Sequence, residues 1–161
     1  MVSVLGVLED GQRIAVKRLS AASDQGIEEL RNELELLARQ EHRNLARLLG
    51  VCLGEENLLV YEYMPNGSLD RFLFGMRFEW LDSTESSRLS WELRYKIIQG
   101  IARGLQYLHE ESRYTIVHRD LKASNILLDA NMNPKISDFG ISKLLGNDLT
   151  HASASRIAGT L

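Results

Sequence analysis

Two short clusters of oxygen-bearing residues lie close together in the second half of this 161-residue sequence. The first is His-Arg-Asp-Leu-Lys-Ala-Ser-Asn at residues 118–125, and the second is Asp-Phe-Gly at residues 138–140. The carboxylates of Asp120 and Asp138 and the amide oxygen of Asn125 are hard ligands, of the kind that Mg²⁺ takes beside the oxygens of a bound phosphate. Zinc would require histidine or cysteine in such a set. The clusters therefore favour chemistry on a magnesium-bound phosphate.

The segment between the two clusters has the pattern of a β-hairpin. Short strands are expected at residues 126–129 and 135–137, joined by Asn131-Met132-Asn133-Pro134. Because a hairpin brings its two ends together, we expect the three oxygen ligands to converge on one site. The competing interpretation is that these Asp and Asn residues only form turns.

A lysine and a glutamate far upstream are predicted to form an internal ion pair. Residues 13–18 have the pattern of a strand, in which Lys17 shares a face with Ala15. Residues 23–40 have the pattern of a helix, and Glu33 lies only about 40° from the last residue of its apolar stripe. That stripe consists of Ile27, Leu30, Leu34 and Leu37. A glutamate that faces the interior needs a cationic partner, and Lys17 is the candidate; a plain surface pair is the alternative.

The other elements divide the chain into a strand-rich part and a helical part. Apolar runs of strand length occupy residues 45–53 and 57–64, and turn residues follow at 64–68. The clearest helix covers residues 90–109, with Ser90 as its N-cap. Its expected core stripe consists of Ile98, Ile101, Leu105 and Leu108, with Ile97 and Ala102 alongside.

The motifs HRDLKASN and DFG, with IAVK at residues 14–17, resemble the catalytic loop, the metal-binding motif and the ATP-contacting strand of eukaryotic protein kinases. Longer stretches, such as LLVYEYMPNGSLDRFLF and PKISDFGISKL, resemble the cysteine-rich or S-domain branch of plant receptor-like kinases. The resemblance covers about residues 6–160. It implies an α+β, bilobal kinase-like fold that is incomplete, with a small antiparallel sheet lobe plus a helix, and the upper part of a helical lobe.

The same resemblance implies how one partial kinase domain is laid out over residues 1–161. The N-lobe would cover residues 1–63 without the family's glycine-rich loop, and the hinge would cover residues 64–66. The C-lobe would cover residues 67–161 and end in the activation segment.

The kinase family also implies roles for individual residues. Asp120 would accept the proton of the attacking hydroxyl, and Lys122 would steady the charge of the γ-phosphate. Asn125 and Asp138 would hold Mg²⁺. His118 is expected to be a buried structural residue rather than a base.

ATP would be bound between the lobes. Lys17 would neutralise the α- and β-phosphates, and Glu33 would hold Lys17 in place. The adenine pocket would consist of Ala15 and Leu127 on either side of the ring, the backbone of Glu62 and Met64, and Tyr61 at its back. An internal column joining the lobes would consist of Leu37, Leu48, His118 and Phe139.

Composition narrows the partners. The chain is 44% hydrophobic and 25% charged with a net charge of −3, which gives no reason to expect nucleic acid. No apolar run approaches the roughly 18 residues of a membrane span, so we expect this chain alone to be soluble. The one cysteine, Cys52, cannot form an intrachain disulfide, which fits a reducing compartment. The resemblance places the presumed parent receptor's kinase on the cytoplasmic side of the plasma membrane.

The expected function is ATP-dependent phosphoryl transfer to Ser or Thr hydroxyls of proteins, since Lys122 within HRDLKASN is typical of the Ser/Thr class. The alternative is a catalytically impaired, ATP-binding or scaffold fragment. It rests on residues 1–13, which contain only Gly6 and Gly11 where a glycine-rich loop is expected, and on the missing A-P-E motif.

Overall fold

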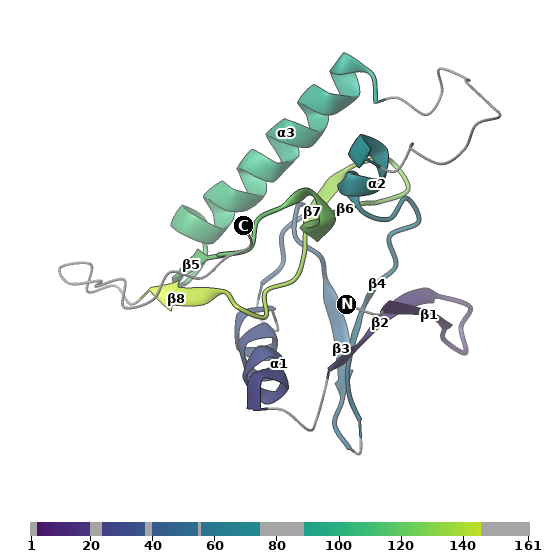
Figure 1. Cartoon of the computed structure of the whole chain (residues 1–161), viewed down its shortest axis with the longest axis vertical. Helices are drawn as coiled ribbons and strands as arrows, with labels where there is room; N and C mark the ends of the chain where they lie inside the picture. The colour runs from purple at the N-terminus through teal and green to yellow at the C-terminus, as the bar shows by residue number, and fades with distance from the viewer. Residues whose placement is uncertain (1–2, 20–23, 38–39, 55, 75–88, 146–161) are drawn as a thin grey trace.

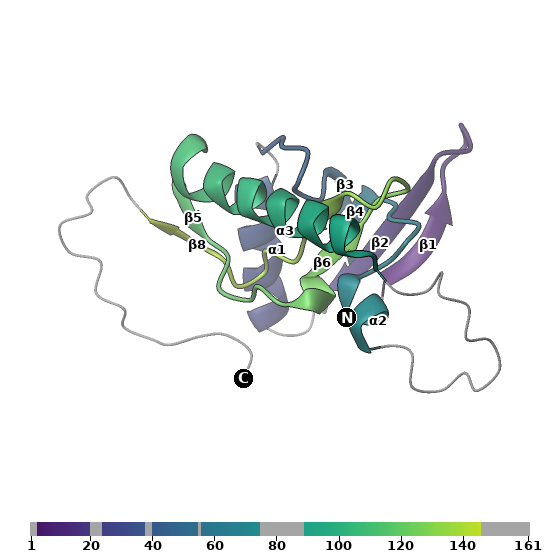
Figure 2. The same cartoon turned by 90° about the horizontal axis from the view of Figure 1, so that it is seen from above.

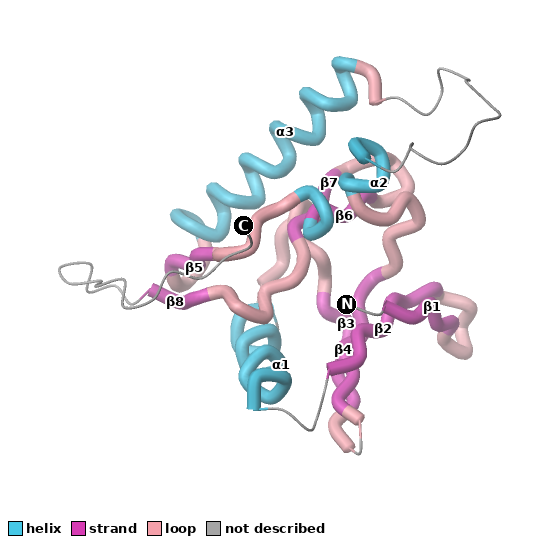
Figure 3. Tube along the Cα trace, viewed as in Figure 1, coloured by secondary structure: helices cyan, strands magenta, loops and turns pink. Residues whose placement is uncertain are grey.

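A computed structural model of the chain describes residues 3–19, 24–37, 40–54, 56–74 and 89–145. Its two parts are a four-stranded sheet with one helix, and a longer helix that lies beside short β-ribbons (Figure 1). The first part consists mainly of strands, and the second part contains the longer helix, as the tube in Figure 3 shows. The arrangement agrees with the expected α+β class.

The sheet has the strand order β1-β2-β4-β3, and every neighbouring pair is antiparallel. Its strands are β1 (Ser3–Val7), β2 (Arg13–Leu19), β3 (Leu48–Cys52) and β4 (Asn57–Glu62). Strand β2 matches the expected strand with one residue more. Strand β1 was not expected, because the first thirteen residues lack a clear alternation.

Helix α1 (Asp24–Leu37) covers one face of this sheet, where Leu30 packs with Leu19 and Leu59. Leu37, from the last turn of the helix, belongs to the larger core that the two parts of the protein share. The expected stripe is wrong at Ile27, which is 52% exposed. Ile27 lies in the first turn of the helix, where its neighbour Gly26 is the buried residue.

The second part is built on α3 (Trp91–Gln106), which continues into one turn of π-helix at Tyr107–Glu111. Ser90 caps α3 as expected, because its hydroxyl accepts a hydrogen bond from the N–H of Leu93. The remaining elements are α2 (Leu69–Phe74), a 3₁₀ turn (Ala123–Asn125) and the strands β5 (Thr115–Val117), β6 (Ile126–Leu128), β7 (Pro134–Ile136) and β8 (Lys143–Leu145). Strands β5 and β8 form one ribbon (Figure 2), and β6 and β7 form the expected hairpin (Figure 1).

The buried face of α3 includes two glycines beside part of the expected apolar stripe. Ile97, Gly100, Gly104 and Leu108 are buried, whereas Ile98 and Ala102 are exposed. A Cβ at Gly100 would lie 2.4 Å from Cγ of Pro134, so the helix backbone lies directly against β7. Trp91, Tyr95 and Ile98 make the opposite side of α3 apolar as well. The expected stripe is therefore wrong at Ile98 and Ala102, whereas Ile101 and Leu105 pack against the core as expected.

The first residues of the apolar run at 45–53 do not join the sheet. Leu45 instead forms a parallel bridge with Ile136 on β7. The N–H of Ala46 donates to the carbonyl of Ile136 at 2.8 Å, and the N–H of Ile136 donates to the carbonyl of Asn44 at 2.9 Å. The run is apolar because it crosses the buried space between the two parts, not because it is one long strand.

The division at residues 64–66 remains a prediction, and parts of the expected C-lobe, 75–88 and 146–161, lie outside the described residues. Within the described ranges, none of the helices combines the length and apolar character needed to cross a bilayer.

The contact between α3 and β7 generates a stability prediction. Gly100→Ala gains helix propensity but forces a methyl group against Pro134, and we expect it to lower the free energy of unfolding by about 1–3 kcal/mol. Urea denaturation measures the change. Gly50→Ala is the matched control, because a Cβ there meets nothing within 4 Å and its stability should be unchanged or slightly higher. Equal effects of the two substitutions would contradict the close packing.

Candidate active site

A buried lysine lies between two carboxylates from different elements. Lys17 on β2 is 5% exposed and Glu33 on α1 is fully buried, and the two form an ion pair. The Lys17 ammonium also donates to the carboxylate of Asp138 at 2.9 Å. The strand, the helix and the segment after β7 therefore meet at one positive charge, and the expected pairing of Lys17 with Glu33 is present.

Tyr61 on β4 completes the surroundings of Glu33, because its hydroxyl donates a hydrogen bond to the second carboxylate oxygen. Burial and the negative charge of Glu33 both raise the pKa of Tyr61, so it stays a phenol that can donate. Burial would lower the pKa of Lys17, but the two carboxylates outweigh it and the pKa of Lys17 is raised. The lysine is therefore held as a cation.

A second polar cluster is formed by the loop that follows β5. The carboxylate of Asp120 pairs with the Lys122 ammonium at 2.8 Å. The buried amide of Asn125 donates to the backbone carbonyl of Asp120 at 2.9 Å and to its carboxylate at 3.0 Å. These bonds fix the orientation of the Asp120 carboxylate, whose side chain is 11% exposed.

The hairpin joins this loop to the Asp-Phe-Gly segment, as the spacing predicted. Both the N–H and the hydroxyl of Ser137 donate to the backbone carbonyl of Asn125, at 2.9 and 3.0 Å. Asp138 directly follows Ser137, so the structure brings Asp120, Asn125 and Asp138 into one region. Sequence reasoning missed Ser137, and its place at the end of a predicted hairpin strand was the available signal.

His118 lies in the protein interior, 3% exposed. Its Nδ1 accepts the N–H of Asp120 at 3.2 Å, its Nε2 lies 2.9 Å from the carbonyl of Ser137, and its ring meets Phe139 edge-on at 4.9 Å. Burial lowers the pKa of His118, which keeps the ring neutral. This placement supports a structural role. Phe139 and Leu37 share a buried core against which Leu48 packs, in line with the expected internal column.

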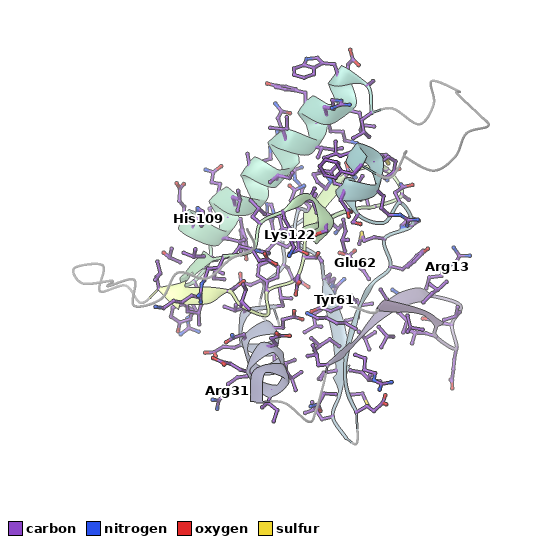
Figure 4. The ribbon with its side chains drawn as sticks, in the orientation of Figure 1. Arg13, Arg31, Tyr61, Glu62, His109 and Lys122 are labelled. Carbon is purple, nitrogen blue, oxygen red and sulfur yellow. The ribbon has the colours of Figure 1, made fainter. Side chains whose placement is uncertain are left out.

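The residues expected around adenine line up across the sheet and the hairpin. Ala15 pairs opposite Tyr61 in the sheet, and Met64 is buried just after β4. Leu127 on β6 pairs opposite Lys135, whose ammonium lies 2.7 Å from the carboxylate of Glu62. The side chains of Tyr61, Glu62 and Lys122 lie in the centre of Figure 4, whereas Arg31 and His109 lie at the outside.

The donor set fits magnesium better than a transition metal. Among the described residues, no three His, Cys, Asp or Glu side chains gather into a closed metal cage. Asp138 and Asn125 instead offer one carboxylate and one amide beside a cation, Lys17. Mg²⁺ takes such a sparse set when phosphate oxygens supply its other ligands.

Comparison with known families agrees with this geometry. A family model described as protein tyrosine and serine/threonine kinase matches residues 4–158. The chain belongs to the protein kinase family. The α+β kinase fold and the family resemblance noted in the sequence are thereby confirmed.

Among its relatives are plant receptor-like kinases. The chain is 58% identical over 156 residues to the G-type lectin S-receptor-like serine/threonine-protein kinase B120 of Arabidopsis thaliana, covering 96% of this chain and 18% of that protein. It is 59% identical to the cysteine-rich receptor-like protein kinase 10 of Arabidopsis thaliana and 60% identical to the cysteine-rich receptor-like protein kinase 6 of Oryza sativa subsp. japonica. These alignments cover 96% of this chain and 22% and 21% of the relatives. This kinase chain thus spans about a fifth of the length of the curated relatives it matches.

The buried pair at the centre of the kinase site generates a second stability prediction. Lys17→Met leaves the Glu33 carboxylate buried without its cation, and we expect a loss of about 3–5 kcal/mol in the free energy of unfolding. The double variant Lys17→Met/Glu33→Leu removes both charges and should recover a large part of that loss. Urea or thermal unfolding measures the stability of both variants. If Lys17→Met fails to fold while the double variant folds, that result also agrees with the prediction.

Arg18→Met is the control for this pair. Arg18 is the next residue on the same strand, and its ion pair with Glu56 is exposed, at 67% and 53% of the two side chains. Such a surface pair contributes about 0–1 kcal/mol, so the control should change little. A double variant as unstable as Lys17→Met would show that the pair is not coupled in this way.

Proposed function

We propose that this chain carries the catalytic segment of a serine/threonine protein kinase, which transfers the γ-phosphoryl group of ATP to Ser or Thr hydroxyls of proteins. The observation that carries the proposal is the 2.9 Å contact between Lys17 and Asp138. This contact joins Lys17, on the sheet, to Asp138, in the segment that lies beside the loop carrying Asp120. Phosphoryl transfer needs a positive site for the phosphates and a proton acceptor next to it, and this contact supports both in one place.

Lys17 would bind the α- and β-phosphates of ATP. Its ammonium is already directed by Glu33 and Asp138, so little reorganisation is needed when the phosphates arrive. Asn125 and Asp138 would hold Mg²⁺, which when bound neutralises phosphate charge. Protein kinases generally use ATP and Mg²⁺, and the donor set described above fits that use.

Asp120 would accept the proton of the attacking hydroxyl. Its carboxylate is held by the amide of Asn125 and the ammonium of Lys122. These contacts fix the direction from which a hydroxyl group can approach the carboxylate. Lys122 has 39% of its side chain exposed, so it can turn from Asp120 toward the charge that develops on the γ-phosphate. Orientation and charge stabilisation thus come from residues within one loop.

The adenine ring would lie between Ala15 and Leu127, against the backbone of Glu62 and Met64, with Tyr61 closing the back. The register that sets Ala15 opposite Tyr61 supports this assignment. So does the ion pair of Glu62 with Lys135, because Lys135 lies opposite Leu127 in the hairpin. This ion pair therefore connects the hairpin that carries Leu127, on one side of the proposed pocket, to Glu62 at its edge.

The likeness to receptor-like kinases supports a signalling context. We propose that the chain acts on protein substrates, at the cytoplasmic side of the plasma membrane, as part of a longer receptor. A nucleotide-binding scaffold that transfers no phosphate is the alternative expected from the sequence.

Phosphoryl transfer is tested by exchanging the proton acceptor. Asp120→Asn keeps the shape of the side chain and removes its basicity, so we expect phosphate incorporation from labelled ATP into a Ser/Thr protein substrate to fall by about 10²–10⁴-fold. Binding of ADP with Mg²⁺, measured by calorimetry, should change little. Asp10→Asn, in an exposed turn, is the control and should leave transfer unchanged.

The two measurements separate the candidate functions. Equal incorporation by the unchanged protein and Asp120→Asn would exclude Asp120 as the proton acceptor. Tight ADP binding without any incorporation would favour the scaffold.

A further inference from the structure

Helix α1 makes a second polar contact with the Asp-Phe-Gly segment, separate from the ion pair of Glu33. The side-chain amide of Asn32 donates a hydrogen bond to the backbone carbonyl of Gly140 at 3.0 Å. The contact spans 108 residues of sequence and is partly buried. None of the roles proposed above uses Asn32.

The helix also touches Gly140 by close packing. A Cβ at Gly140 would lie 3.2 Å from Cγ of Glu29 and 3.5 Å from a carboxylate oxygen of Glu33. Glu29, Asn32 and Glu33 are spaced i, i+3 and i+4, so they lie on one face of the helix. One helix face therefore meets both ends of the segment 138–140, Asp138 through Lys17 and Gly140 directly.

This segment needs external support, because its first residue has a costly backbone conformation. Asp138 has φ 68°, in the left-handed region of backbone conformation that residues other than glycine seldom adopt. Phe139 anchors the middle of the segment, where it is fully buried, and Asn32 holds the far end. Gly140 is two peptide bonds from Asp138, so the backbone position of Gly140 is coupled to that of the residue that carries the carboxylate.

We propose that Asn32 is a positioning residue for the Asp138 carboxylate and so sets how readily the site takes Mg²⁺ with a nucleotide. The inference rests on the proposed function and deepens it. Asn32 acts through Gly140 on the metal side of the site. It does not act on the adenine side, whose proposed residues lie on β2, β4 and β6 and in the segment that follows β4.

Asn32→Leu tests the proposal, because leucine keeps the branched shape of the side chain and favours the helix more than asparagine does, but cannot donate a hydrogen bond. Loss of one net hydrogen bond corresponds to a change of about three- to tenfold in an equilibrium constant. We expect the Mg²⁺ concentration that half-saturates binding of a fluorescent ADP analogue to rise by that factor. Binding of the analogue in EDTA should stay the same.

Arg31→Leu is the matched control. Arg31 is exposed on the same helix and points away from the centre of the molecule (Figure 4), so the same new residue there should change neither binding curve. Hydrogen–deuterium exchange of the metal-free protein gives a second readout. Peptides covering residues 138–145 should exchange faster in Asn32→Leu than in Arg31→Leu. Asn32→Gln, which restores a donor, should recover part of the Mg²⁺ response.

The outcomes separate this inference from the proposed function. An unchanged protein whose nucleotide binding does not depend on Mg²⁺ would overturn both. Normal Mg²⁺ dependence in the unchanged protein with the same curve in Asn32→Leu would overturn the inference alone. Faster exchange with no change in the Mg²⁺ requirement would also overturn it, because Asn32 would then stabilise the segment without directing Asp138.

Discussion

The burial of one ammonium group, that of Lys17, constrains the whole arrangement. Removing such a charge from water costs several kcal/mol, and the cost is offset only if carboxylates reach it with good geometry. Glu33 comes from a helix and Asp138 from a segment 121 residues away. Neither carboxylate can be supplied by the strand that carries the lysine. The positions of β2, α1 and the segment after β7 therefore depend on one another, and the sheet cannot be placed independently of the second part of the molecule.

A backbone contact far from this charge determines whether Asp138 can reach it. Gly104 on α3 lets Ile136 approach the helix, since a Cβ there would lie 2.9 Å from Cδ1 of Ile136. Ile136 is also hydrogen-bonded through its backbone to Asn44 and Ala46, which lead into β3. Two residues further along the chain is Asp138. The glycines of α3 thus position the segment of the proposed metal ligand Asp138 without contacting it, which links core packing to the chemistry of the site.

Much of the site was predictable because its chemistry follows local patterns. Glu33 was assigned from its angle on a helix, and the convergence of Asn125 with Asp138 followed from a hairpin. The prediction failed where one local pattern fits two environments. Both sides of α3 are apolar, so Ile98 was assigned to the core although it is exposed. Asn32 could not be found at all, because its partner is a backbone carbonyl 108 residues away. Every residue presents the same backbone carbonyl, so nothing in the sequence marks Gly140 as the acceptor.

The two positive φ angles in the site show what determines residue identity there. Arg119 and Asp138 both have φ 68°, a conformation that glycine would adopt with less strain. Glycine at Asp138 would remove the carboxylate that pairs with Lys17. Side-chain chemistry therefore prevails over backbone preference, and the strain has to be opposed by neighbouring contacts. Those neighbours are His118 and Phe139, each next to one strained residue, buried, and in edge-on contact with each other. Their packing holds both strained residues in place, so the core beneath the site supports its backbone.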